Sequence, residues 1–109
     1  MYNKVEYDDI IEENRNNNLQ EINIGNNKLL CNKMGIIYRK MKSGNWKEIE
    51  NKENHKKGYN VILIDKKQYT RAKLVLYAYG GINLYDKNIN ICHINKDKLD
   101  CTLDNLKIR

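Results

Sequence analysis

The hydrophobic residues of this chain fall into short runs, some alternating with polar residues, and turn-forming residues separate the runs. Ile22 and Ile24 alternate with a polar residue before Gly25-Asn26-Asn27, a sequence typical of a turn between two strands. A period of two predicts antiparallel strands with one buried face. By the same pattern, further short strands are predicted at 29–30, 36–38, 46–49, 59–64, 68–71 and 89–91.

After a predicted hairpin turn at Asp65-Lys66-Lys67, the hydrophobic period changes from that of a strand to that of a helix. Apolar positions now repeat at i, i+3, i+4 and i+7, and they are Ala72, Val75, Leu76 and Tyr79. Gly80-Gly81 follows, and glycine commonly ends helices. The sequence therefore predicts one central helix over 72–79. Three later leucines, at 99, 103 and 106, are spaced to pack a short helix or coil onto the sheet.

The N-terminal segment has a different character from the rest of the chain. Residues 1–20 are polar and acidic, with a short helix predicted over Tyr7 to Glu13 and a linker or loose turn over Arg15 to Asn18. Residues 21–109 are predicted to form a single domain. The predicted fold class is α+β, with a small antiparallel β-sheet and hairpins, one central helix and a shortened ββα motif at the end.

The charge distribution changes this picture by suggesting a type of partner. The net charge is +6, but residues 1–25 hold two basic and six acidic residues, so the remaining 84 residues carry 18 basic residues against 8 acidic ones. A basic body with an acidic head is typical of a nucleic-acid-binding protein. An A+T-rich genome, which favours Lys, Asn, Ile and Tyr codons, is the alternative explanation of this composition.

Composition also excludes several classes of protein. The longest apolar run, 74–78, is far shorter than the roughly 18 residues of a membrane span, and the first residues contain no apolar stretch typical of a secretory signal. Three cysteines without a Cys-x-x-Cys pair indicate a reducing compartment rather than a disulfide framework, and their spacing matches no closed zinc site. We expect an intracellular protein without a membrane association, located in the host cytoplasm or nucleus if the source is a virus.

Two groups of basic residues are candidates for phosphate contacts. The first group, expected on one face of the sheet, is Arg39, Lys40, Lys42 and Lys47. The second, expected around the hairpin and the start of the helix, is Lys56, Lys57, Lys66, Lys67, Arg71 and Lys73. Each phosphate contact would steepen the salt dependence of binding by about one unit of logarithmic slope. A solvated, lysine-rich surface is the alternative.

The second half of the chain resembles the HNH endonuclease family, in the branch associated with phage and giant-virus homing endonucleases. The specific part of the resemblance is His93 to Leu106, with weaker matches at 58–64 and 73–79. Upstream, 32–38 resembles the small DNA-contacting module that often precedes this nuclease domain. The resemblance covers roughly residues 30–109 and implies double-stranded DNA as the partner.

The resemblance also implies roles for individual residues. His93 stands at the position of the general base that activates water, and Asn105, followed by Leu106, stands at that of the asparagine that fastens the loop. Cys92 occupies the position where the family has an acidic metal ligand, and a thiol is a poor ligand for Mg²⁺. The family's second metal ligand lies on a helix beyond the Asn-Leu pair, whereas this sequence ends at Arg109.

Three hypotheses follow. The first and preferred one is a DNA-binding protein on an HNH-like scaffold with a degenerate metal site, for which no cofactor is expected. The second is an active nicking or homing-type endonuclease that uses His93 and Mg²⁺ or Mn²⁺, with ligands such as Asp97, Asp100 or Asp104. The third is a phage or viral inhibitor that binds a protein. A homodimer or a protein partner is compatible with each of them.

Overall fold

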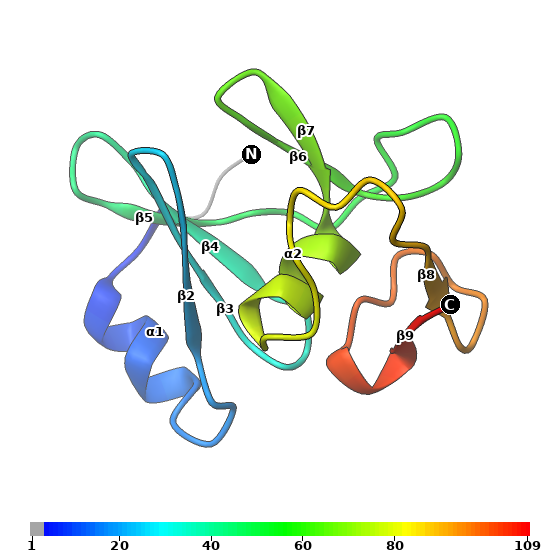
Figure 1. Ribbon diagram of the computed structural model, residues 1–109. Helices are drawn as coiled ribbons and strands as arrows, with labels where there is room; N and C mark the ends of the chain where they lie inside the picture. Colours follow the sequence, from blue (N-terminus) through cyan, green and yellow to red (C-terminus); the bar gives the residue numbers. More distant parts are fainter. Residues whose placement is uncertain (1–3) are drawn as a thin grey trace.

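The structure is a computed structural model that describes the backbone from residue 4 and the side chains from residue 6 to residue 109 (Figure 1). The elements, in chain order, are β1 (Lys4–Val5), α1 (Tyr7–Glu13), β2 (Gln20–Ile24), β3 (Asn27–Cys31), β4 (Ile37–Lys40), β5 (Trp46–Glu48), β6 (Val61–Ile64), β7 (Lys67–Thr70), α2 (Arg71–Ala78), β8 (Ile91–His93), the 3₁₀ helix η1 (Leu103–Asn105) and β9 (Leu106–Ile108).

The largest element of the fold is a five-stranded antiparallel sheet with the order β1-β5-β4-β3-β2. Two further pairs, β6–β7 and β8–β9, form separate two-stranded ribbons. Successive side chains of a strand point to opposite faces. Leu29 and Cys31 of β3 therefore contribute to one hydrophobic cluster and Leu30 to another.

Helix α1 covers one face of this sheet. Ile10 of α1 is completely buried and packs with Leu30, Tyr38 and Trp46. Asn14 at the end of the helix is also buried, where its Nδ2 donates to the Ile10 carbonyl oxygen at 2.8 Å and to the Tyr38 hydroxyl at 3.3 Å. The helix predicted over Tyr7 to Glu13 is observed with those bounds. The division of the chain near residue 20 stays a prediction.

The opposite face of the sheet carries the β6–β7 ribbon and α2, and the main hydrophobic core lies between them. Asp65 and Lys66 connect β6 to β7 with φ values of 49° and 67°, the left-handed conformation of a tight two-residue hairpin turn. Thr70 caps α2 by accepting a hydrogen bond from the Lys73 backbone N–H at 3.3 Å. Gly80, with φ 77°, follows the helix, as the sequence predicted.

Arg71, the first residue of α2, is buried in the core, which corrects its prediction as a nucleic-acid contact. Its Nε donates to Asn60 Oδ1 at 2.9 Å, Nη1 to the Gly35 carbonyl oxygen at 2.7 Å and Nη2 to the Ile49 carbonyl oxygen at 2.7 Å. Burial lowers the pKa of this guanidinium. Arg71 therefore joins the sheet to the hairpin and helix instead of facing a ligand.

The C-terminal region contains the short ribbon β8–β9, in which His93 lies opposite Leu106. The strand predicted at 89–91 is observed at Ile91–His93, and β9 was not predicted from the sequence. Three residues are too few to show an alternating pattern, and the partner strand lies a whole loop away. The predicted α+β class is confirmed, with antiparallel sheets and two α-helices. Across residues 4–109, no helix is both long and apolar enough to cross a membrane.

Candidate functional site

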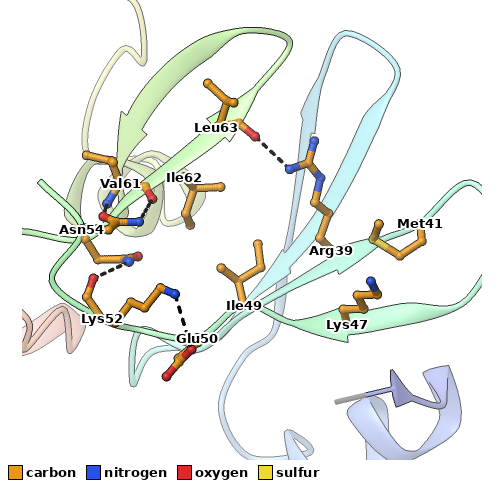
Figure 2. Close-up of a pocket in the computed structure, with 11 residues that line it drawn as sticks. Arg39, Met41, Lys47, Ile49, Glu50, Lys52, Asn54, Val61, Ile62 and Leu63 are labelled. Atoms are coloured by element: carbon orange, nitrogen blue, oxygen red, sulfur yellow. Dashed lines mark hydrogen bonds and ion pairs between the residues drawn. The ribbon is translucent and has the colours of Figure 1, made fainter. Parts of the chain in front are cut away.

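A groove runs between the large sheet and the β6–β7 ribbon (Figure 2). Strands β4 and β5 contribute Arg39 and Lys47, β6 contributes Leu63, and 50–54 closes the other side. The groove has a volume of about 470 Å³ and is adjacent to a second hollow of about 700 Å³ around the β4–β5 turn. Both hollows share Arg39, Met41 and Lys47 in their linings, so they form one continuous surface, which we call the β4–β6 groove.

The charged side chains of the β4–β6 groove are mostly basic. They are Arg39, Lys40, Lys42, Lys47 and Lys52, with Glu50 as the acidic one. Lys52 Nζ lies 3.9 Å from Glu50 Oε2 in an exposed ion pair. Arg39 and Lys47 are directly opposite each other in the register of β4 and β5. The excess of positive charge in a concave surface attracts anions.

Arg39 is held in place at the junction of the groove and the ribbon. Its Nη1 donates to the Leu63 carbonyl oxygen at 2.8 Å and its Nη2 donates to Asn27 Oδ1 at 3.0 Å. Figure 2 shows the guanidinium reaching from the sheet to β6. A guanidinium has five N–H donors, so these two bonds leave donors for a ligand and restrict the orientation of the side chain.

The structure divides the predicted basic residues among several places. Arg39, Lys40, Lys42 and Lys47 all line the β4–β6 groove. Arg39 and Lys47 lie on the same face of the sheet, but Lys40, the next residue of β4, pairs with Trp46 and points to the opposite face, so the four do not share one face as expected. The other predicted residues lie outside this groove. Lys66 is in the β6–β7 turn, and Lys67 begins β7 with its Nζ 6.0 Å from the Tyr85 ring centroid. Lys56 and Lys57 are exposed in the loop before β6, and Lys73 lines a second pocket.

Lys52 is a groove residue that sequence reasoning missed. It belongs to a polar stretch without hydrophobic periodicity, so no local pattern indicates which way it faces. Its position depends on the hydrogen bond that Asn60 Nδ2 donates to the Lys52 carbonyl oxygen at 2.7 Å. Asn60 also accepts from the buried Arg71. Only the tertiary structure could have added Lys52 to the set.

A second site surrounds His93, at a pocket of about 330 Å³ between α2 and the β8–β9 ribbon. His93 Nε2 is buried and has no hydrogen-bond partner among the described residues. Burial lowers the pKa of His93 below its ordinary value of 6.5, although the charges of Asp100 and Asp97 act in the opposite direction. The imidazole is therefore neutral at neutral pH, which is the form that can accept a proton.

Asn105 connects both ends of the loop between β8 and β9. Its Nδ2 donates to Asn95 Oδ1 at 3.0 Å and to the Asp100 carbonyl oxygen at 2.8 Å, and its Oδ1 accepts from the Asn95 backbone N–H at 3.0 Å. The Asn105 carbonyl oxygen accepts a further bond from the Ile94 N–H at 2.8 Å. These contacts close a loop whose regular structure is limited to the short 3₁₀ helix η1, and they are the kind of bonds by which an asparagine fastens a loop.

The charged side chains that line the pocket around His93 are basic. Lys73, Lys98 and Arg109 are the charged lining residues of the pocket, and like charge repels a cation. Within residues 4–109, no group of three or more His, Cys, Asp or Glu side chains is arranged to hold a metal ion.

Asp97 and Asp100, the two aspartates whose charges act on His93, accept hydrogen bonds within the β8–β9 loop. Asp100 accepts hydrogen bonds from Asn95 Nδ2 at 2.7 Å and from the Thr102 N–H at 3.2 Å, and the bonds from Thr102 lower the pKa of Asp100. Asp97 accepts from the Leu99 N–H at 3.0 Å. Both carboxylates therefore act as turn residues in this loop.

Comparison with known proteins gives a structural match. No protein family model matches the sequence, and no curated protein sequence matches it. Among solved structures, the chain is similar to that of the HNH homing endonuclease I-HmuI, with a TM-score of 0.53 and 21% sequence identity. The subject of that structure is DNA binding and cleavage by I-HmuI. The match covers 74% of this chain and 45% of that one, so this chain corresponds to less than half of the I-HmuI chain. The similarity shows an HNH-like fold.

Proposed function

We propose that this chain binds duplex DNA through the β4–β6 groove, and that its described residues form a degenerate version of the HNH metal site. The cationic lining of the groove, on a fold shared with a DNA-binding endonuclease, is the observation that carries the proposal. Basic side chains bind DNA by neutralising phosphates and releasing counterions. Such contacts need surface charge at a suitable spacing and no bound metal.

The test is a fluorescence anisotropy titration of a labelled DNA duplex at several salt concentrations. We expect the triple variant Lys40→Gln/Lys42→Gln/Lys52→Gln to lower the slope of log affinity against log salt by about three units, because each lost phosphate contact contributes about 0.9. The matched control is Lys33→Gln/Lys87→Gln/Lys107→Gln, which removes the same charge at exposed positions outside the groove. The control should retain nearly the full slope.

Two results would overturn the proposal. If the wild-type protein does not bind the duplex, the cationic surface has another partner, and the protein-binding hypothesis gains support. If the groove variant and the control lose affinity equally, binding depends on net charge alone and the groove is not the interface.

A metal-dependent endonuclease is the second candidate, because His93 Nε2 is unpartnered and the loop beside it is well fastened. Incubation of supercoiled plasmid with the protein and Mg²⁺ or Mn²⁺ distinguishes the two functions. A degenerate metal site predicts that the plasmid stays supercoiled. Nicked circles that disappear in His93→Ala, a variant that retains duplex binding, would favour the endonuclease.

A further inference from the structure

The β6–β7 ribbon has an outer face that does not serve the core. Ile62 and Ile64 of β6 and Tyr69 of β7 point inward and are buried. The alternate positions carry Leu63 and Gln68, which are paired directly across the two strands. In Figure 1 this ribbon extends away from α2 and the β8–β9 ribbon, with its turn at the edge of the molecule. The pair therefore lies on a projecting, solvent-facing surface.

This pair places an apolar side chain directly beside an amide on the solvated face of the ribbon. Leu63 is 59% exposed, although the other large aliphatic residues at the centre of the ribbon are buried. Gln68 is exposed as well, and its amide has no hydrogen-bond partner in the described part of the chain. An apolar side chain thus lies beside an amide that offers both a free donor and a free acceptor.

These two groups match what the edges of base pairs present in the DNA major groove. A glutamine amide can pair with N6 and N7 of adenine, and an apolar side chain can contact the thymine methyl group. The major groove, about 12 Å wide, also admits a two-stranded β-ribbon. The tight turn at Asp65-Lys66 keeps the tip of this ribbon narrow.

The surroundings of the pair favour DNA over a neutral partner. Lys66 and Lys67 place two exposed positive charges at the tip of the ribbon. Arg39 bonds to the Leu63 carbonyl oxygen, so the ribbon is attached to the cationic floor of the β4–β6 groove. A DNA strand whose phosphates occupy that groove would bring adjacent base edges to Leu63, which is itself a lining residue.

We infer that the outer face of the β6–β7 ribbon, centred on Leu63 and Gln68, is a base-reading surface that enters the major groove of duplex DNA. The inference rests on the proposed function, because the groove residues supply the affinity for phosphates. Leu63 and Gln68 add discrimination between sequences. Binding strength and sequence preference are therefore assigned to different side chains of one interface.

The experiment starts with a selection from a pool of randomised DNA duplexes by the wild-type protein. Affinities are then measured for the selected duplex and for a scrambled duplex of the same composition. We expect Gln68→Ala to reduce the ratio of these affinities by about 10-fold, the discrimination typical of one bidentate base contact. Leu63→Ala should reduce it less. Neither variant should change the salt slope, because neither removes a charge, and both positions are exposed, so folding should be preserved. Gln68→Ala should also leave the affinity for the scrambled duplex unchanged, because Gln68 does not line the β4–β6 groove.

Matched controls separate base reading from general effects. Asn88→Ala removes an exposed amide, and Ile108→Ala removes an exposed aliphatic side chain, both outside the ribbon. They should leave the ratio unchanged. Lys66→Gln should weaken binding to both duplexes equally.

The outcomes distinguish this inference from the function on which it rests. If the wild-type protein binds duplexes without sequence preference, or if Gln68→Ala and Leu63→Ala keep the full preference, the inference is wrong and the proposed function stands. If the wild-type protein binds no duplex, both are wrong. If Gln68→Ala and Leu63→Ala lose the preference for the selected duplex and keep the wild-type salt slope, the inference is supported.

Discussion

The β4–β6 groove and the His93 pocket are built in different ways. The groove takes three of its charged side chains, those of Arg39, Lys40 and Lys47, from regular strands, whose pairing fixes their spacing. Most of its charged side chains are solvent-accessible. The pocket depends on a loop held by the side-chain amides of Asn95 and Asn105, and its central polar atom, His93 Nε2, is buried. The groove presents exposed charge along paired strands, whereas the pocket places a buried nitrogen beside the basic residues of its lining.

Under the proposed function, this difference assigns binding and hydrolysis to separate regions with different structural requirements. Attraction of phosphates by exposed lysines tolerates small shifts in position and depends chiefly on charge. Hydrolysis needs a base and an electrophilic partner held to within a fraction of an ångström, which demands an intact supporting shell. Substitutions in the loop could therefore abolish hydrolysis in a protein of this fold and leave DNA binding in the groove intact.

The largest expected effect comes from the loss of Arg71, which holds Asn60, a residue that lines both the groove and the pocket. Arg71→Met removes three hydrogen bonds to buried oxygens and should lower the free energy of unfolding by roughly 3 kcal/mol or more, because each unsatisfied buried group costs about 1–3 kcal/mol. Urea denaturation measures this loss. Arg39→Met, at the partly exposed groove position, is the control and should cost about 1 kcal/mol. Equal losses would contradict the assignment of Arg71 as the clamp between sheet and helix.

An intermediate effect is expected at the fastened loop. Asn105→Ala should cost about 1.5 kcal/mol, because it removes three exposed or partly buried hydrogen bonds, each with a net contribution of about 0.5 kcal/mol. Hydrogen exchange should accelerate in the β8–β9 loop, while duplex affinity through the groove should stay unchanged. The exposed Asn88→Ala is the matched control. Loss of duplex binding in Asn105→Ala with the fold retained would mean that the two regions are coupled.

The smallest effect concerns the pH dependence of stability. The pKa of His93 is lowered by burial, so below pH 6.5 the unfolded chain binds a proton that the folded chain does not. The free energy of unfolding should therefore decrease as the pH falls below 6.5, and His93→Gln should flatten that part of the profile. Urea denaturation of both proteins at several pH values tests this. Parallel profiles would show that the imidazole is not desolvated in solution.

Several local features were predictable because they depend on neighbouring residues. The helix at Tyr7–Glu13, the turn at Asp65-Lys66 and the end of the central helix at Gly80 follow from short-range patterns. Arg71 was misassigned because its place in the sequence, beside Lys73 and after the basic hairpin, resembles that of a surface residue. Its buried acceptors come from positions 35, 49 and 60, and no local pattern connects them.

By itself, the sequence determined the α+β class and the basic body of the protein, because these depend on periodicity and composition. The roles that the resemblance to HNH endonucleases implies for His93 and Asn105 stay predictions. The tertiary structure decided which cations share a surface, that Lys52 joins them and that Arg71 does not. It also decided that the Leu63–Gln68 pair faces solvent. The physical reason is that burial and cross-strand pairing bring together residues far apart in the chain, and a local pattern carries no record of those contacts.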